Sequence, residues 1–281
     1  MALSTISLTS GMRANLFSLQ KTSIDMEVTQ KRLSTGLKVN SALDDQINFF
    51  TAQEHKMRAS DLASRKDGMS EAIQTIKAAN VGIEGINNLI AQAKSLAQSA
   101  LSAGSTDALA FGTQFGEVLT QINEMAEDSG YKGINLLQSG ALTIEFAPSA
   151  GDATLKLTGF GGTDTQFTTL NAVTVTSGGW VTGTGDVSSA VIQTAIDGLE
   201  TAMGDLRTES KKLSSNLSII TAREDFTSNM TNTLKDGAAK LTEADMNEEG
   251  ANMLMLQTRQ ALGTTSLSMA SQAAQSVLRL F

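Results

Sequence analysis

The chain has 281 residues, of which 41% are hydrophobic and 4% aromatic, and its formal net charge at pH 7 is −8. This length allows one large or two modest domains with a buried core. The acidic balance argues against nucleic acid and anionic lipid as partners. The absence of cysteine excludes disulfides, thiolate nucleophiles and cysteine-ligated metals, and a single proline leaves almost nothing to interrupt long helices.

The charge is distributed unevenly along the chain. Residues 1–44 and 241–281 together carry seven basic and seven acidic residues, so the whole net charge lies in residues 45–240. Neutral ends suit a molecule whose ends pack against copies of themselves. The sequence contains no run of about 18 apolar residues, so we do not expect a membrane-spanning segment. The N-terminus has no basic residue before Arg13 and no compact apolar core, so we do not expect a cleavable signal peptide.

The first predicted helix ends near residue 33. Its apolar residues recur every seven positions, which is typical of a coiled coil, and Leu8, Leu16 and Leu37 fill much of the complementary position. The seven-residue row consists of Met12, Leu19, Met26 and Leu33.

The helical pattern breaks off at "STGLKVNSALDDQINFF", residues 34–50. The adjacent carboxylates of this segment could form an acid–base pair, but adjacent side chains usually point apart. We therefore expect a hinge in which these carboxylates stabilise a loop or cap a helix. The predicted hinge residues are Gly36, Asn40, Asp44 and Asp45.

Two further helices are predicted after the hinge, one from about residue 57 to 102 and one ending near Gly130. From residue 139 to 189 the chain is rich in Gly, Ser and Thr and holds the only proline. Short alternations of apolar and polar residues there predict small strands joined by turns. The alternating apolar residues are Leu142, Ile144 and Phe146, then Leu155 and Leu157, then Val173 and Val175.

Helical spacing resumes at Leu199 and continues to Leu234, where "DGAAK" at 236–240 suggests a second hinge before a last helix that begins near Met246. We expect a mainly α-helical fold. Residues 1–44 and 241–281 would form a long antiparallel coiled coil, and residues 45–240 a helical bundle with a small β-rich insert at 141–189. The apolar rows of the last helix include Met253, Leu256, Leu267, Ala270, Ala274, Val277 and Phe281.

Three segments carry a resemblance to a known family. "QKRLSTGLKVNSALDD" (30–45), "GYKGINLL" (130–137) and the whole of residues 243–281, ending in "SVLRLF", closely resemble bacterial flagellins, in particular short alphaproteobacterial ones. The match covers roughly residues 1–140 and 190–281. Leu43 stands where a lysine is common, "QINFF" replaces a run of small residues, and Gly250 replaces a common serine.

The resemblance implies a structural subunit of the flagellar filament, neither an enzyme nor a cofactor-binding protein, that is exported without cleavage and acts outside the cell. It implies a helical homopolymer, with a filament cap protein, a hook–filament junction protein and an export chaperone as partners. The terminal apolar rows would then form the subunit interface, and residues 34–50 the spoke between the inner and outer parts. A hook–filament junction protein and a flagellin-like surface adhesin stay open as alternatives. An enzyme embedded in a filament would need a metal or nucleophile site in the insert, and none is visible in the sequence.

The resemblance also implies equivalents of the residues that an animal innate receptor contacts. Receptor-detected flagellins carry a stretch of the form Leu-Gln-Arg-Val-Arg-Glu-Leu-Ala, and the matching run here places Gln92, Lys94 and Ser95 at the two arginines and the glutamate. Neither Gln nor Lys offers the planar bidentate donor of Arg. We therefore expect the filament subunit to escape this receptor, unless these positions simply drifted on a buried helix face.

Overall fold

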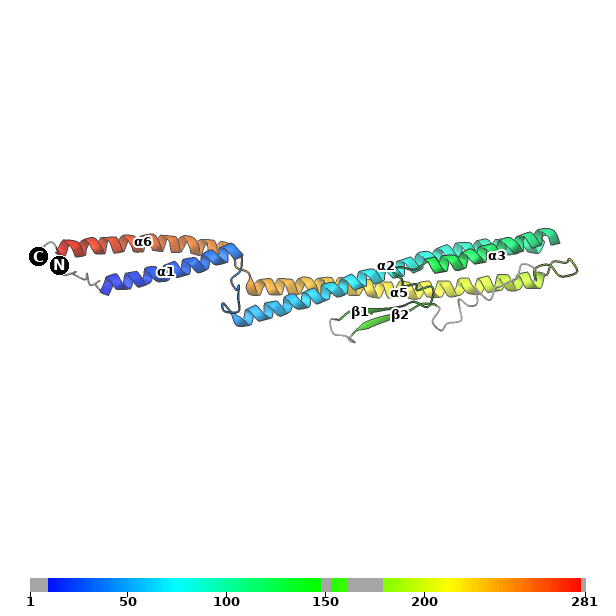
Figure 1. The fold of residues 1–281 in the computed structure, drawn as a ribbon, viewed down its shortest axis with the longest axis horizontal. Coiled ribbons are helices and arrows are strands. Elements are labelled where there is room, and N and C mark those ends of the chain that lie inside the picture. The colour runs from blue at the N-terminus through cyan, green and yellow to red at the C-terminus, as the bar shows by residue number, and fades with distance from the viewer. Residues whose placement is uncertain (1–9, 148–152, 161–178, 279–281) are drawn as a thin grey trace. The chain divides into compact units, whose positions relative to one another are not determined.

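The computed structural model describes residues 10–147, 153–160 and 179–278 (Figure 1). The chain divides into two compact units, which are considered separately below. Residues 1–57 and 233–281 form the terminal unit, and residues 58–232 form the central unit. The alternation predicted at Val173 and Val175 lies outside the described residues, as do Leu8 and Phe281.

In the terminal unit the two ends of the chain form a pair of antiparallel helices, α1 (Ser10–Thr35) and α6 (Met246–Leu278), which lie side by side (Figure 1). Two side-chain contacts fix this direction. Near the start of α1, the side-chain amide of Asn15 donates to the carbonyl of Gly263 at 3.4 Å, and near its end Arg32 contacts Glu249 at 2.9 Å. The predicted antiparallel pairing of the chain ends is confirmed.

The second helix begins earlier than the sequence suggested. It was expected near residue 57, but α2 runs over Gln46–Ser102, so "QINFF" forms its first turn and not part of the hinge. Asp45 explains the difference, because its side-chain oxygen Oδ1 accepts a hydrogen bond from the backbone N–H of Asn48 at 3.0 Å. A side chain that satisfies a free N–H of the first turn is a sufficient start signal for a helix.

The hinge expected at residues 236–240 is not present. Helix α5 (Ser189–Thr242) continues through this segment without a break. A single glycine costs a helix about 1 kcal/mol relative to alanine, and the fully buried Ala238 next to Gly237 packs this turn into the unit. The chain leaves the helix at residues 243–245 instead, and α6 starts at Met246 as expected.

The central unit is a bundle of α2, α3 (Ser105–Asp128) and α5. Helix α3 folds back on α2 after Ala103 and Gly104, and α5 runs antiparallel to α2, as the contacts Lys66–Ser228 and Lys94–Glu200 show. The seven-residue apolar row predicted on α2 lies in the centre of the core. Its members Met69, Ile76, Ile83, Ile90 and Ala97 are all buried.

The insert contributes an antiparallel pair of strands, β1 (Ala141–Glu145) and β2 (Thr154–Thr158), in which Leu142 faces Leu157 and Ile144 faces Leu155. These are the strands that the alternation predicted. Directly after β2, the backbone at Gly159 passes close to Gln138. A side chain at position 159 would not fit, because its Cβ would lie 2.3 Å from the carbonyl oxygen of Gln138. The expected fold class is confirmed: the chain is mainly α-helical, with its two ends paired and a small β element in the middle.

Candidate functional site

The described residues hold no group of three or more His, Cys, Asp or Glu that could bind a metal ion. Among the described residues, no helix is both long enough and apolar enough to cross a membrane. What the molecule does offer is exposed apolar surface. Most of the large apolar side chains that the described residues expose belong to the terminal unit, so this unit is the candidate site.

The face of α1 that meets α6 has one apolar and one polar row. The predicted apolar row, Met12, Leu19, Met26 and Leu33, is half-buried. The companion row does not contain Leu16, which is exposed. Asn15, Thr22 and Thr29 occupy it instead, and Thr22 satisfies its hydroxyl by donating to the carbonyl of Ser18 at 2.8 Å.

On α6 the facing rows are mixed as well. Leu256 and Glu249 are buried, whereas Met253, Leu267, Ala270 and Ala274 are half-buried. Gly263 leaves room for the side chain of Leu19, because a Cβ at this glycine would lie 2.5 Å from Leu19 Cδ2. The side chain of Val277, like Phe281, lies outside the described residues. The seam between α1 and α6 therefore contains few fully buried apolar side chains.

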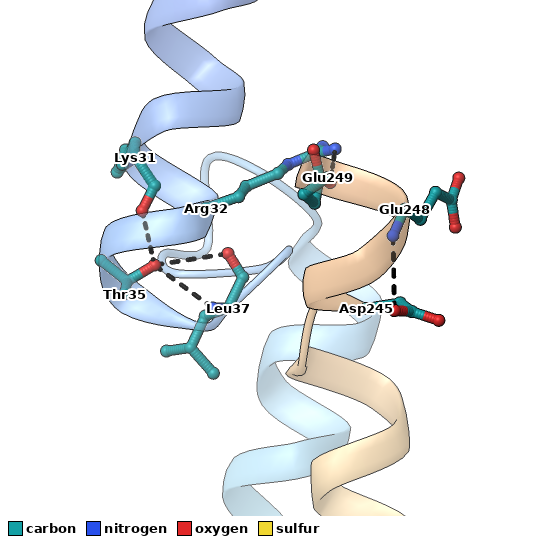
Figure 2. A network of polar contacts seen from close by, with 7 residues as sticks. All are labelled: Lys31, Arg32, Thr35, Leu37, Asp245, Glu248 and Glu249. Atoms are coloured by element: carbon teal, nitrogen blue, oxygen red, sulfur yellow. Dashed lines mark hydrogen bonds and ion pairs between the residues drawn. The ribbon is translucent and has the colours of Figure 1, made fainter. Parts of the chain in front are cut away.

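An ion pair closes the seam where α1 ends and α6 begins (Figure 2). Arg32 Nη1 donates to Glu249 Oε1 at 2.9 Å, and the side chain of Glu249 is only 9% exposed. The second carboxylate oxygen of Glu249 is buried and accepts no hydrogen bond within the described residues. Nearby, Asp245 caps α6 through the backbone N–H of Asn247 at 2.8 Å. The carboxylate of Glu249 thus depends on Arg32.

The linker between α1 and α2, residues 36–45, is tied to the segment that joins α5 to α6. These ten residues are the non-helical part of the stretch 34–50, and from here on the name spoke refers to them alone. Gly36 has a φ of +70°, a backbone conformation that favours glycine at the end of a helix. The backbone N–H of Lys38 donates to the carbonyl of Thr242 at 2.8 Å, and the N–H of Ala244 donates to the carbonyl of Gly36 at 2.9 Å. Both crossings of the chain are therefore held together by backbone hydrogen bonds.

The two adjacent carboxylates of the spoke serve two different turns. Asp44 Oδ2 accepts the backbone N–H groups of Asn40 and Ser41 at 3.0 Å each, and these bonds, that of Asn40 most, lower the pKa of Asp44. The pKa of Asp45 is lowered chiefly by the backbone N–H of Asn48, which it caps. These hydrogen bonds belong to a loop turn and to a helix cap. The two carboxylates do not form an acid–base pair.

The predicted receptor-contact equivalents lie on α2 in the central unit. Gln92 and Ser95 are exposed, and Lys94 Nζ forms an ion pair with Glu200 at 2.5 Å. Because Gln92 and Ser95 lie at the surface, drift on a buried helix face does not account for them.

Each terminal helix carries a further apolar row that faces away from the seam. On α1, Phe17 and Ile24 are exposed seven residues apart. On α6, Met255, Leu262 and Met269 are exposed at the same spacing. The sequence contains this signal, but the neighbouring rows of the same helices have a stronger seven-residue pattern. Paired terminal helices with apolar rows on their outer faces are typical of a subunit that packs against other protein chains.

Comparison with known families agrees with this class. The bacterial flagellin N-terminal helical region matches residues 4–141, and the bacterial flagellin C-terminal helical region matches residues 192–281. The chain therefore belongs to the bacterial flagellins, the subunits of the flagellar filament.

The relatives are flagellins of alphaproteobacteria. The chain is 28% identical to flagellin FljM of Caulobacter vibrioides over 285 residues, which cover both chains completely. It is also 28% identical to a flagellin of Brucella melitensis, over 95% of each chain. Among solved structures, a Bacillus cereus flagellin aligns with a TM-score of 0.45 and 19% identity, over 57% of this chain and 88% of that one.

Proposed function

We propose that this flagellin polymerises through its terminal unit, with the outer rows of α1 and α6 packing against the terminal helices of neighbouring copies. The observation that carries the proposal is the exposure of large apolar side chains at seven-residue spacing on both helices. Within one copy the seam already uses the other face of each helix. A neighbouring copy that covers the outer rows would complete the burial.

The energy available at these rows is sufficient for assembly. Burying one large apolar side chain contributes about 1.5–3 kcal/mol, and the outer rows hold Phe17, Ile24, Met255, Leu262 and Met269. Their sum exceeds the cost of association only when several neighbours contribute. Contacts between different faces of identical copies generate an open helical assembly and not a closed ring.

We assign residues 1–44 and 241–281 to the inner tube of the filament and residues 45–240 to its outer part. The seam residues Met12, Leu19, Met26 and Leu33, together with Met253, Leu256, Leu267, Ala270, Ala274, Val277 and Phe281, and the exposed Leu16, belong to the inner tube. The proposed role is purely structural, outside the cell, after export of the uncleaved chain. A chaperone, a filament cap and the hook–filament junction would be its other partners.

We further propose that the terminal helices α1 and α6 become ordered only on assembly. Among the described residues of the seam, Leu256 is the large apolar side chain that is buried, together with the polar Thr22, Thr29 and Glu249. The central unit, by contrast, has an extensive apolar core of its own. Isolated helices with so little burial are marginal in water. Neighbouring copies would supply what the seam lacks.

Electron microscopy and limited proteolysis of the purified chain test both statements. Seeded or salted-out protein should form filaments. In the monomer, protease should trim both ends and leave a resistant fragment close to residues 36–245, and the ends should become resistant in filaments. A monomer that never polymerises would refute the filament assignment. Ends that resist protease equally in monomer and filament would refute ordering on assembly.

A further inference from the structure

A hollow of about 260 Å³ lies on the terminal unit where the spoke meets the first turns of α2 and the end of α5. Leu37, Val39, Phe49 and Ala52 form its apolar wall, and Lys56 stands among its polar lining residues. A cavity of roughly 150 Å³ accommodates a benzene molecule. The hollow therefore has room for an aliphatic side chain.

The same spoke carries an apolar side chain that contacts almost nothing in its own copy. Leu43 is 97% exposed, the most exposed large apolar side chain of the described residues. The turn beneath it is nevertheless held firmly, because Asp44 accepts the backbone N–H groups of Asn40 and Ser41 at 3.0 Å and the hydroxyl of Ser41 at 3.2 Å. A leucine displayed on a fixed turn loses little conformational freedom when it binds.

The charges around the two features are complementary. Asp44 and Asp45 follow Leu43 directly, and the backbone hydrogen bonds that lower the pKa of each carboxyl favour its ionised form. The hollow presents Lys56 beside its apolar wall. An apolar tip with an anionic flank thus matches an apolar hollow with a cationic rim, which favours one orientation of docking.

We propose that Leu43 of one copy inserts into this hollow of a neighbouring copy and so forms a second contact between subunits, at the level of the spoke. This inference rests on the proposed polymerisation. Because the tip and the hollow are different surfaces, the contact is head-to-tail and can repeat without closing, as a filament requires. A second copy is the occupant because each copy carries both halves of the contact.

The identity of both residues matters for the contact, since Leu43 forms the tip and Phe49 part of the apolar wall. A lysine at the tip would bring a charge to an apolar wall that already has Lys56 beside it, and a small residue in place of Phe49 would remove part of that wall. The contact would therefore favour copies of this chain over subunits with a lysine or a small residue at these two positions.

Cysteine cross-linking tests the contact directly, because the natural chain contains no cysteine. Leu43→Cys and Gln53→Cys each place one thiol, the second on the lining of the hollow. A one-to-one mixture of the two variants is assembled into filaments, oxidised and run on a denaturing gel without reductant. We expect covalent dimers from the mixture and none from either variant alone. A mixture of Leu43→Cys with Leu109→Cys, which is exposed on α3 in the central unit, is the control and should give none.

The energetic counterpart is the critical concentration for assembly. Leu43→Ala and Phe49→Ala should each raise it about tenfold, and the double variant should cost little more than either alone because both remove the same contact. Ile47→Ala, also exposed on the first turn of α2, is the matched control and should have less than a twofold effect. Monomer melting of the central unit should not change in any of them.

The outcomes separate this inference from the proposed function. Wild-type protein that forms no filaments would refute polymerisation itself. Normal filaments without mixed dimers, or with an unchanged critical concentration in Leu43→Ala, would refute the spoke contact and leave polymerisation intact. Dimers from Leu43→Cys alone would show a symmetric tip-to-tip contact and would also overturn the inference.

Discussion

Replacing Arg32 with alanine is the sharpest test of the seam between α1 and α6. The substitution removes the donor of the 2.9 Å hydrogen bond to Glu249 and leaves a carboxylate whose side chain is 9% exposed. Its second oxygen has no hydrogen-bond partner among the described residues, so no neighbour within reach compensates for the loss. The expected effect is therefore the cost of an unpaired, nearly buried charge.

The magnitude follows from the exposure of the two partners. A hydrogen bond to a charged group contributes about 1.5–3 kcal/mol. The side chain of Arg32 is 40% exposed, and solvent screening weakens an ion pair with an exposed partner. We therefore expect a loss of about 2 kcal/mol, which corresponds to an approximately 30-fold change in an equilibrium constant. If the seam forms on assembly, this loss appears in the critical concentration.

The assay measures the protein left in the supernatant after filaments are pelleted at equilibrium. Arg32→Ala should raise this concentration about 30-fold. The double variant Arg32→Met with Glu249→Met should return it to within about fivefold of wild type, since apolar replacement of a buried ion pair is often neutral. Lys132→Ala, which removes an exposed contact to Glu71 on α2, is the control and should change it less than twofold. An unchanged critical concentration in Arg32→Ala, with or without a lower melting temperature of the monomer, would refute the reasoning.

Three other predictions concern the seam, the spoke and the outer surface. Leu267→Asp places a charge in the seam at a cost of several kcal/mol, so pelleting should find no filaments while the central unit melts normally; filament growth would contradict the seam. The lowered pKa of Asp45 means that its capping is present above the unfolded pKa of about 3.9 and is lost as pH falls through the folded value, so the protection factor of the capped N–H should fall in acid and not at neutral pH. Purified monomer should activate receptor reporter cells weakly, and the variant Gln92→Arg, Lys94→Arg, Ser95→Glu should activate them more; strong activation by the unmodified monomer would end the idea.

The sequence predicted the elements that one physical signal determines. The row from Met69 to Ala97 recurs every seven residues because it is buried along its whole length, and the strands around Ile144 and Leu157 alternate because one face is covered. In both cases the residues that form the apolar pattern are the residues that are buried or partly buried. The start of α6 after Asp245 follows equally from a local cap.

The errors arose where two signals competed. The first turns of α2 lack the seven-residue row that predicts a helix, and the cap formed by Asp45 starts the helix there without it. At Gly237 the burial of Ala238 outweighed a local helix breaker. The sequence pattern predicts leucines in the companion row of α1, whereas the structure has Thr22 there. Burying this threonine leaves no polar group unsatisfied, because its hydroxyl donates a hydrogen bond to a carbonyl of its own helix. Tertiary packing, which one sequence does not display, decided the case of Gly237, whereas local hydrogen bonds of Asp45 and Thr22 decided the other two.

The polar row of α1 has a consequence for the order in which the molecule forms. Under the proposed export, the chain must refold outside the cell. With no cysteine and one proline, it has no disulfide step and at most one slow prolyl isomerisation. The central unit, with its own core, can fold first.

The terminal helices would then need to stay available until they meet the filament end. A seam with Asn15, Thr22 and Thr29 opposite α6 is too weak to close alone, yet Arg32 and Glu249 still select one register when it does close. Apolar residues in the polar row would pair α1 with α6 in the monomer and bury more surface before any neighbour arrived. Because the polar row limits pairing in the monomer, the apolar surface of the terminal helices remains available for burial in the filament. The ion pair between Arg32 and Glu249 then sets the register in which α1 and α6 pair.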